Sequence, residues 1–264
     1  MVRNCRDDHE PSVVEIHSIR VYLLERIDEK TELSPPPNLR LAPDTNWNRH
    51  YGATPRTMIE KVRLWEYNEI KKPMVMPWIE NLCITIYPGN EIHEALYLSG
   101  LYEPNTMLAV QRLVSPGHVF LDVGANVGCY TLFASRIVGS AGCVCAFEPS
   151  SREYRRLVEN IRLNDLTNVI PVNAAVVETQ GKRMITIACE HHSGHNTMGE
   201  HFMYDGVESI GTEAVETITL DEFVHAQSFD RVDVIKLDIE GGEYKALLGA
   251  NGILKEYQPV LIIE

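Results

Sequence analysis

The 264-residue chain lacks several features that would place it in a common class of protein. It has no excess of basic residues, since 24 Lys and Arg against 37 Asp and Glu leave a net charge of −13. A general nucleic-acid-binding protein needs a basic surface to replace counterions, so nucleic acid is not an expected partner. No apolar run approaches the ~20 residues that span a bilayer, and the start, MVRNCRDDHE, is charged where a signal peptide would be apolar. We expect a cytoplasmic protein without a membrane partner.

Cysteine motifs and repeats are also missing. None of the six cysteines forms a CxxC pair, and Cys143 and Cys145 alternate along an apparent strand, which indicates small core residues. Apolar residues make up 44% of the chain, which is enough for a sizeable core and argues against wholesale disorder.

Residues 1–80 differ in character from the rest, and we interpret them as an N-terminal extension to a domain over residues 81–264. The stretch LSPPPNLRLAPDTNW is rich in proline, and TPRTMIEKVRLWEYNEIKKP predicts one amphipathic helix that ends at Pro73. Residues 81–99 carry alternating apolar residues around Pro88-Gly89-Asn90, which predicts a hairpin or two short strands. A helix is expected from Pro104.

From Gly117 onward, apolar strands alternate with amphipathic helices. The expected strands are 118–123, 142–148, 169–176, 232–238 and 259–264, and the expected helices are 128–138, 151–164, 220–226 and 243–254. A polar excursion over residues 181–216 is expected to hold antiparallel strands and a loop. This alternation predicts an α/β fold, a Rossmann-like, doubly wound, mostly parallel sheet with its ligand at the carboxyl ends of the strands.

The stretch FLDVGANVGCY places a carboxylate at the edge of a glycine turn. Its glycines lack the G-x-G-x-x-G spacing of a dinucleotide site, and Asp122 would repel a pyrophosphate. A cation suits this turn better, and S-adenosylmethionine carries an ammonium and a sulfonium. We therefore expect Asp122 to receive the ammonium, directly or through water, while Gly124 and Gly128 let the backbone pass close to the ligand.

Two further strand ends complete the expected nucleoside site. Glu148 ends the second strand, where an acidic residue can accept both ribose hydroxyls, although a solvated glutamate is the alternative. Asn173 and Ala174 follow the third strand and could line an adenine, or belong to an ordinary loop.

The segment VIKLDIEGGEYKALLGA supplies the charges of the fourth strand. Lys236, Asp238 and Glu240 share one face if the strand persists, and a buried strand needs partners for such charges. Asp238 should emerge beside the glycine turn, whereas Glu243 is expected to stabilise the start of the next helix.

The stretches FLDVGANVGCYTLFAS, AFEPS, TLDEF and VIKLDIEGGEYKALLGA, with SGLYEP upstream, resemble the FkbM-type family of S-adenosylmethionine-dependent methyltransferases over about residues 98–264. The resemblance implies a Rossmann-like methyltransferase fold and O-methylation of small metabolites or sugars. It places Glu103 near the methionine end of the cofactor and Asp238 with Glu240 at the reacting end. The cofactor-binding residues that we expect are Glu103, Asp122, Gly124, Ala125, Asn126, Gly128, Glu148, Pro149, Asn173, Ala174 and Asp238.

The chain departs from the family at its last strand. Such folds usually add two more strands after the fifth, and VLIIE would otherwise be an apolar sheet edge. We expect either a truncated form or another segment over this edge, with the hairpin at 81–99 as one candidate.

The expected chemistry centres on Asp238, with Glu240 and His195 as further catalytic candidates. Asp238 could act as a general base toward a hydroxyl or hold a metal with Glu240 and Glu264, and the sequence does not decide whether a metal binds. The histidines His191, His192, His195 and His201 crowd the excursion. They fit a solvated substrate loop, one acid–base histidine or a metal site.

We favour an O-methyltransferase that acts on a small-molecule acceptor, and a homo-oligomer is possible. A non-catalytic S-adenosylmethionine-binding or scaffold protein and an N-methyltransferase are the alternatives. A dinucleotide dehydrogenase is disfavoured because of the charge at the glycine turn.

Overall fold

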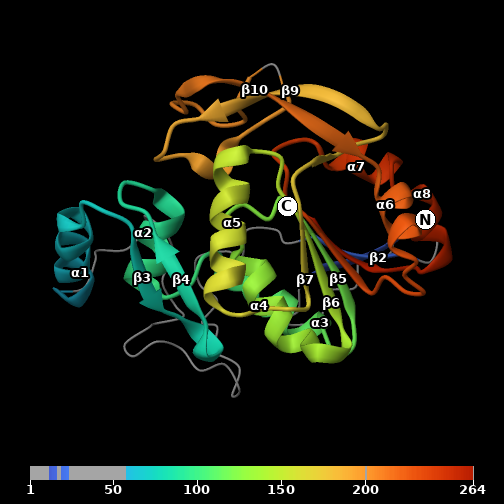
Figure 1. Cartoon of the computed structure of the whole chain (residues 1–264), viewed down its shortest axis with the longest axis horizontal. Coiled ribbons are helices and arrows are strands. Elements are labelled where there is room, and N and C mark those ends of the chain that lie inside the picture. The colour runs from blue at the N-terminus through green and yellow to red at the C-terminus, as the bar shows by residue number, and fades with distance from the viewer. Residues whose placement is uncertain (1–11, 17–18, 24–57, 200, 264) are drawn as a thin grey trace.

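A computed structural model describes residues 12–16, 19–23, 58–199 and 201–263, with side chains from Arg63 onward. Its central sheet has seven strands in the order β1-β2-β12-β11-β5-β6-β7 (Figure 1). These strands are β1 (Ser12–Ile16), β2 (Ile19–Leu23), β5 (Val119–Val123), β6 (Cys143–Phe147), β7 (Val169–Val172), β11 (Val234–Leu237) and β12 (Val260–Ile263). All neighbouring pairs from β2 to β7 are parallel, and β1 is antiparallel to β2.

Helices cover both faces of this sheet. On one side lie α3 (Pro104–Leu113), α4 (Cys129–Val138) and α5 (Ser151–Leu163), and on the other lie α6 (Leu220–Gln227), α7 (Glu243–Leu248) and α8 (Asn251–Glu256) (Figure 1). Successive residues of a strand point to opposite faces, so Phe120 enters one core cluster and Leu121 the other. The predicted doubly wound α/β fold is confirmed, and the strand order reverses between β5 and β11.

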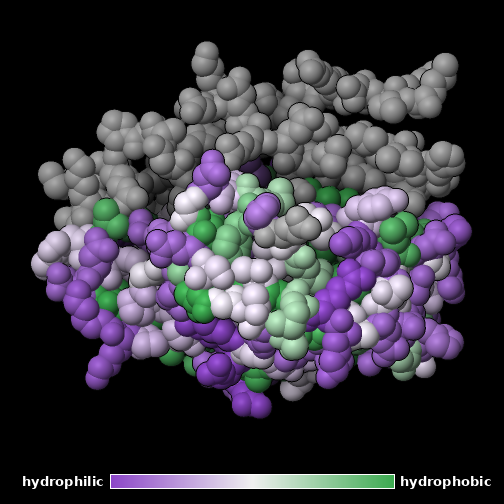
Figure 2. Space-filling view, turned by 90° about the horizontal axis from the view of Figure 1, so that it is seen from above, coloured by the Kyte–Doolittle hydropathy of each residue, from purple (hydrophilic) through white to green (hydrophobic). Residues whose placement is uncertain are grey.

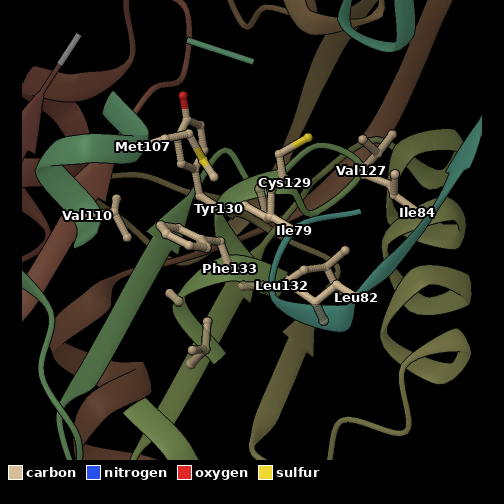
Figure 3. Packing of buried hydrophobic residues seen from close by; sticks show 14 of the residues in the cluster. Ile79, Leu82, Ile84, Met107, Val110, Val127, Cys129, Tyr130, Leu132 and Phe133 are labelled. Carbon is tan, nitrogen blue, oxygen red and sulfur yellow. The ribbon is translucent and has the colours of Figure 1, made fainter. Parts of the chain in front are cut away.

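The first core cluster joins the sheet to the elements that precede it. In Figure 3, Phe133 and Leu132 of α4 lie among Val110 of α3 and Leu82 and Ile84 of the preceding segment. That segment contains α1 (Met58–Glu69), β3 (Met74–Pro77), β4 (Cys83–Ile86) and α2 (Glu91–Ser99). The predicted helix before Pro73 and the helix from Pro104 are both confirmed.

The edge strand β12 is covered by a segment from the opposite end of the chain. Leu261, Ile262 and Ile263 pair in parallel with Val21, Tyr22 and Leu23 of β2. The expectation that another segment covers this edge is therefore confirmed, but residues 81–99 were the wrong candidate. Only β4 in that stretch is a strand, and it pairs with β3, because Asn90 caps a helix where a second strand was expected.

The polar excursion forms a layer of its own above the carboxyl ends of the central strands (Figure 1). Its β9 (Gly181–Ala188) and β10 (Ser209–Ile218) pair antiparallel as predicted, and β8 (Ala175–Val176) joins β10 in parallel. The expected strand 169–176 therefore divides between two sheets after Val172. Seen from the side of this layer, the described surface is mostly hydrophilic with scattered hydrophobic side chains (Figure 2).

Two expected elements are shorter than predicted. The strand toward Asp238 ends at Leu237, and the expected helix 243–254 divides into α7 and α8 around Gly249. A Cβ atom at Gly249 would lie 2.1 Å from the Val177 carbonyl oxygen, so close packing requires glycine there. No helix in the described ranges has the length and apolar character needed to cross a membrane.

Candidate active site

A cavity of about 660 Å³ opens where β5, β6 and β11 end beneath the excursion layer. Its walls come from the turn after β5, the start of α3, the turn after β11 and η3 (Ser193–His195). Carboxyl ends of parallel strands meet here because the strand order reverses between β5 and β11. The volume suits a ligand the size of a nucleoside cofactor with a small second substrate.

The glycine turn is shaped by contacts within the protein. Gly124 has φ +83°, and a Cβ atom there would lie 1.9 Å from the Asp238 carbonyl oxygen. Gly128 has φ +97°, and a Cβ atom there would lie 2.7 Å from Leu157. These glycines let the turn pack against β11 and α5, and close approach of a ligand to the turn stays a prediction.

Glu148 lies in the cavity wall at the end of β6 and is held by the adjoining turns. Its two carboxylate oxygens accept hydrogen bonds from the backbone N–H groups of Asn126 and Ser150, each at 2.9 Å. Burial, reinforced by Glu153, raises the pKa of the Glu148 carboxyl to about 8 despite those two hydrogen bonds. The oxygens keep further lone pairs that can accept from hydroxyl groups in the cavity.

Lys236 is the centre of a buried charge network. Its Nζ lies 2.9 Å from Asp238 Oδ2, 4.0 Å from Asp122 Oδ1 and 4.5 Å from the centre of the Tyr130 ring. Burial alone would lower the pKa of Lys236, but Asp238, Asp122 and Glu103 outweigh it and hold that pKa above its usual range. The ammonium therefore remains charged and compensates the carboxylates around it.

Asp122 lies behind this network and is fully buried. Thr131 Oγ1 donates to Asp122 Oδ2 at 2.5 Å, and the other oxygen has no hydrogen-bond partner among the described residues. Full burial raises the pKa of the Asp122 carboxyl, with Lys236 opposing the shift. Asp122 is absent from the cavity wall, so its contact with an ammonium stays a prediction, and in the structure its neighbour toward the cavity is Lys236.

Glu103 stands at the start of α3 and faces the same cavity. It accepts a hydrogen bond from the Tyr130 hydroxyl at 2.6 Å. Burial and then the nearby charge of Asp238 raise the pKa of the Glu103 carboxyl. Two carboxyl groups with one lysine between them thus occupy the wall between α3 and β11.

His195 is clamped between two carboxylates. Its Nδ1 lies 2.8 Å from Glu240 Oε1, and its Nε2 lies 3.1 Å from Glu91 Oε1. Hydrogen bonds to Glu240 and then Glu91 raise the pKa of His195 to about 10, so the ring is an imidazolium at neutral pH. A histidine that holds both protons is poorly suited to act as a base, and the geometry favours a role in joining η3 to the turn after β11.

Comparison with known proteins decides the family. The Methyltransferase FkbM domain matches residues 122–264, more than half of the chain. The chain belongs to the FkbM methyltransferase family. Residues 122–264 are therefore an FkbM methyltransferase domain, and S-adenosylmethionine stays the methyl donor that the sequence predicts.

Two curated relatives resemble this FkbM methyltransferase over part of their length. Hexuronic acid methyltransferase AglP from Haloferax volcanii is 30% identical over 144 residues, which make up 54% of this chain and 54% of the relative. Methyltransferase sdnD from Sordaria araneosa is 25% identical over 162 residues, which make up 52% of this chain and 62% of the relative. The chain thus spans roughly half of the length of the relatives that it matches.

Solved structures show shorter similarities. A SAM-dependent methyltransferase from Aquifex aeolicus is 25% identical and aligns over 30% of this chain and 42% of its own, with a TM-score of 0.27. TYW2 from M. jannaschii in complex with AdoMet is 21% identical and aligns over 39% of this chain and 43% of its own, with a TM-score of 0.29.

The cavity of this FkbM methyltransferase has the chemistry that the cofactor requires. Six carboxylate side chains line it, and Lys236 is the one lysine or arginine among the described lining residues. Lys236 is paired with Asp238, and the His195 imidazolium is held by Glu240 and Glu91, so neither cation is placed for a pyrophosphate. A sulfonium and an ammonium suit such an acidic wall. Glu148 would hold the ribose through its free lone pairs, and the bound cofactor would supply an activated methyl group.

The structure brings most of the predicted site residues together. Ten line the cavity, namely Glu103, Gly124, Ala125, Asn126, Glu148, Pro149, Ala174, His195, Asp238 and Glu240. Asp122 and Gly128 do not, and neither does Asn173, which donates to the carbonyl oxygens of Glu148 and Pro149 at 2.9 and 3.0 Å. Their roles toward the cofactor stay predictions.

Other outcomes concern the turn after β11. Asp238 and Glu240 do not share a strand face, because the strand ends at Leu237 and Glu240 has φ +53°. Glu243 lies in the first turn of α7 as expected, and its carboxylate accepts from the backbone N–H of Ile239 at 3.0 Å, which stabilises the preceding turn. Glu264, a possible metal ligand, lies outside the described residues.

The sequence prediction assigned no role in the site to three residues that line the cavity, namely Lys236, Tyr130 and Glu91. Lys236 was noticed as a charge on a buried strand, and its need for partners was the available signal. Tyr130 and Glu91 gave no such signal, because their partners Glu103 and His195 lie 27 and 104 positions away in the chain.

Proposed function

We propose that this FkbM methyltransferase methylates a hydroxyl group of a small polar acceptor, with Asp238 as the group that accepts the hydroxyl proton. The position of Asp238 carries the proposal. Its backbone N–H donates to the Val123 carbonyl at 3.1 Å, and its carbonyl oxygen packs against Gly124. Its partly exposed carboxylate therefore stands in the cavity beside the cofactor turn, where a transferred methyl group and its acceptor must meet.

Lys236 and Glu103 support this role. Lys236 donates to one oxygen of Asp238 at 2.9 Å, which orients the carboxylate in the cavity. Glu103, whose carboxyl pKa is raised by burial, offers a nearby second group that can hold a proton. The protein thus aligns the nucleophile and removes its proton, while the layer above the cavity helps to exclude water.

The charges of the cavity favour a neutral polyhydroxy acceptor. Glu91, Asp205 and Glu240 stand on the side of the excursion layer, and no arginine lines the cavity among the described residues. An acceptor carboxylate would meet these charges without a free cation to balance it. The relative named a hexuronic acid methyltransferase supports a sugar-like acceptor, and we expect a neutral sugar to be preferred here over an acidic one.

N-methylation is the second candidate, because the same acidic wall attracts a cationic amine. An amine that has lost its proton needs no strong base at the site, whereas a hydroxyl does. Replacement of Asp238 should therefore affect the two reactions differently.

The test uses the full chain with S-adenosylmethionine and a panel of neutral hexoses, hexuronic acids and amino sugars, with release of S-adenosylhomocysteine as the readout. For a hydroxyl acceptor, Asp238→Asn should lower kcat by roughly 10²–10⁴-fold, with cofactor affinity measured separately by calorimetry. Asp165→Asn makes the same chemical change at an exposed position outside the cavity and should retain activity. Full kcat toward a hydroxyl acceptor in Asp238→Asn would refute Asp238 as the base, and turnover of amino sugars alone at nitrogen would refute O-methylation.

A further inference from the structure

The most informative feature outside the expected cofactor site is a cluster at the cavity rim that we call the rim triad, formed by Glu91, His191 and His192. One ligand atom from each of these side chains lies within 4.8 Å of the others. Glu91 begins α2, and the two histidines follow β9 in the turn before η3. We propose that the rim triad binds one divalent transition-metal ion of the zinc type.

The backbone on both sides of the rim triad is fixed by hydrogen bonds. The Glu91 N–H donates to the His191 carbonyl oxygen at 3.1 Å. Asn90, which is fully buried, donates through Nδ2 to Ser193 Oγ at 2.6 Å and to the Glu190 carbonyl oxygen at 3.0 Å. Segments about 100 residues apart are thereby locked together, so the carboxylate and the imidazoles converge without a metal.

Each histidine has one ring nitrogen engaged by the protein. His191 Nδ1 lies 3.2 Å from the Gly89 carbonyl oxygen, and His192 Nδ1 lies 3.7 Å from Cys189 Sγ. Metal-binding histidines usually donate one ring N–H to a carbonyl or similar group, which orients the ring and leaves the other nitrogen for the metal. The surroundings of both rings fit that arrangement.

The ligand set indicates the class of metal. Two imidazoles and one carboxylate suit zinc and related ions, whereas magnesium and calcium prefer oxygen ligands alone. Zinc bonds of ~2.0–2.1 Å place neighbouring ligands roughly 3.4 Å apart, so modest rotations of the exposed His191 and its neighbours would close the site. Glu91 can share its oxygens between a metal and His195, which lies 3.1 Å from Oε1.

The rim triad adjoins the acceptor side of the cavity. Glu91 and His192 line the cavity, and three protein ligands leave a coordination position open to it. Resting on the proposed O-methylation, that position would take a second hydroxyl of the acceptor.

The first test is calorimetric titration of the EDTA-treated full chain with ZnCl₂, and with CoCl₂ followed by visible absorption. We expect one equivalent to bind and affinity to fall at least about tenfold in His191→Ala and His192→Ala. His201→Ala removes an exposed histidine from the same excursion and should bind like the wild type. Thermal melting of each variant without metal checks that it folds. Glu91→Gln alters the third proposed ligand and should also weaken zinc binding. Equal affinity in all variants, or no binding, would overturn the metal site.

A second measurement separates this site from the proposed function. Binding of S-adenosylmethionine to His192→Ala should match the wild type, because the nucleoside contacts lie on the other wall. Zinc binding through the triad without any hydroxyl methylation would leave the metal site standing and defeat O-methylation. If hydroxyl methylation runs at full rate in EDTA and zinc does not bind, O-methylation stands and the metal site is refuted. Zinc binding that leaves KM for the acceptor unchanged would refute the role in acceptor binding.

Discussion

Glu148 should make cofactor binding depend on pH near neutrality. Its carboxyl is buried, and its pKa is raised to about 8, first by burial and then by Glu153. Ribose hydroxyls donate hydrogen bonds, so they bind best to the ionised carboxylate. Below the raised pKa the free protein holds a proton on Glu148, and binding of the nucleoside must release it.

The size of the effect follows from this linkage. If the bound state requires the carboxylate, affinity should fall up to about tenfold, or ~1.4 kcal/mol, for each pH unit below the pKa. With a pKa of about 8, binding at pH 6 should thus be up to ~100-fold weaker than on the plateau above pH 8. Proton release should approach one per nucleoside bound at pH 6 and decline toward zero at pH 9.

The assay is calorimetry from pH 6 to 9 in pairs of buffers with different ionisation enthalpies. 5′-Methylthioadenosine serves as the probe, because it keeps the ribose and lacks the titrating amino group of the cofactor. Glu148→Gln should bind more weakly at high pH and lose the slope. A flat affinity in the wild type, or an unchanged slope in Glu148→Gln, would refute the reasoning.

Four stability predictions can be checked by urea unfolding or hydrogen exchange. Because the folded-state pKa of Glu148 is raised, its contribution to stability is complete below pH ~4.5 and is lost as pH rises through about 8. The free energy of unfolding of the wild type should therefore fall over that pH window. An equal fall in Glu148→Gln would contradict this. Gly124→Ala should lower the free energy of unfolding by ~3 kcal/mol or more, because the new Cβ atom clashes with the end of β11. Gly117 has a similar φ of +81° but open space around it, so Gly117→Ala should cost only ~1–2 kcal/mol. Equal losses in the two variants would show that the clash is relieved. Lys236→Met should lower the free energy of unfolding by about 3–5 kcal/mol at pH 7, because it leaves buried carboxylates unpaired. Part of this loss should disappear at low pH, where the carboxylates take up protons. A loss that does not depend on pH would point to altered packing instead. Removal of residues 1–23 should speed amide exchange in β12, and unchanged protection would mean that β2 does not shield this edge.

The central fold was predictable because its signal is local. Strands buried on both faces must be apolar throughout, and each is followed by an amphipathic helix, so five strands could be read without knowledge of their partners. The cover over β12 was not predictable, since pairing between Val21 and Leu261 joins segments some 240 positions apart and leaves no pattern in either. The segment after Asn90 was misread because its apolar residues suit a strand as well as a helix, and the cap at Asn90 decided between them.

The candidate site was predictable where strand ends carry the chemistry. Glu148 and Asp238 follow parallel strands, and the topology alone brings such residues to one edge of the sheet. The histidines were different, because their crowding fitted a solvated substrate loop, one acid–base histidine or a metal site. In the structure His195 turns toward Glu240 and Glu91, while the adjacent His191 and His192 face Glu91. Their spacing could not decide between these alternatives, because the turn that holds them takes its shape from Asn90, about 100 residues earlier.

Asn126 connects the parts of the site that the sequence keeps apart. Its backbone N–H donates to Glu148 at 2.9 Å, and its side-chain amide donates to the Ser193 carbonyl at 3.2 Å. The first contact changes strength when Glu148 gains or loses its proton, and the second reaches the turn that carries the acceptor-side histidines. Ionisation of Glu148 on nucleoside binding would strengthen the first bond and hold Asn126, which has φ +49°, in its strained conformation. Cofactor binding should therefore also order the turn at Ser193, so the two substrates would share a physical link through one asparagine.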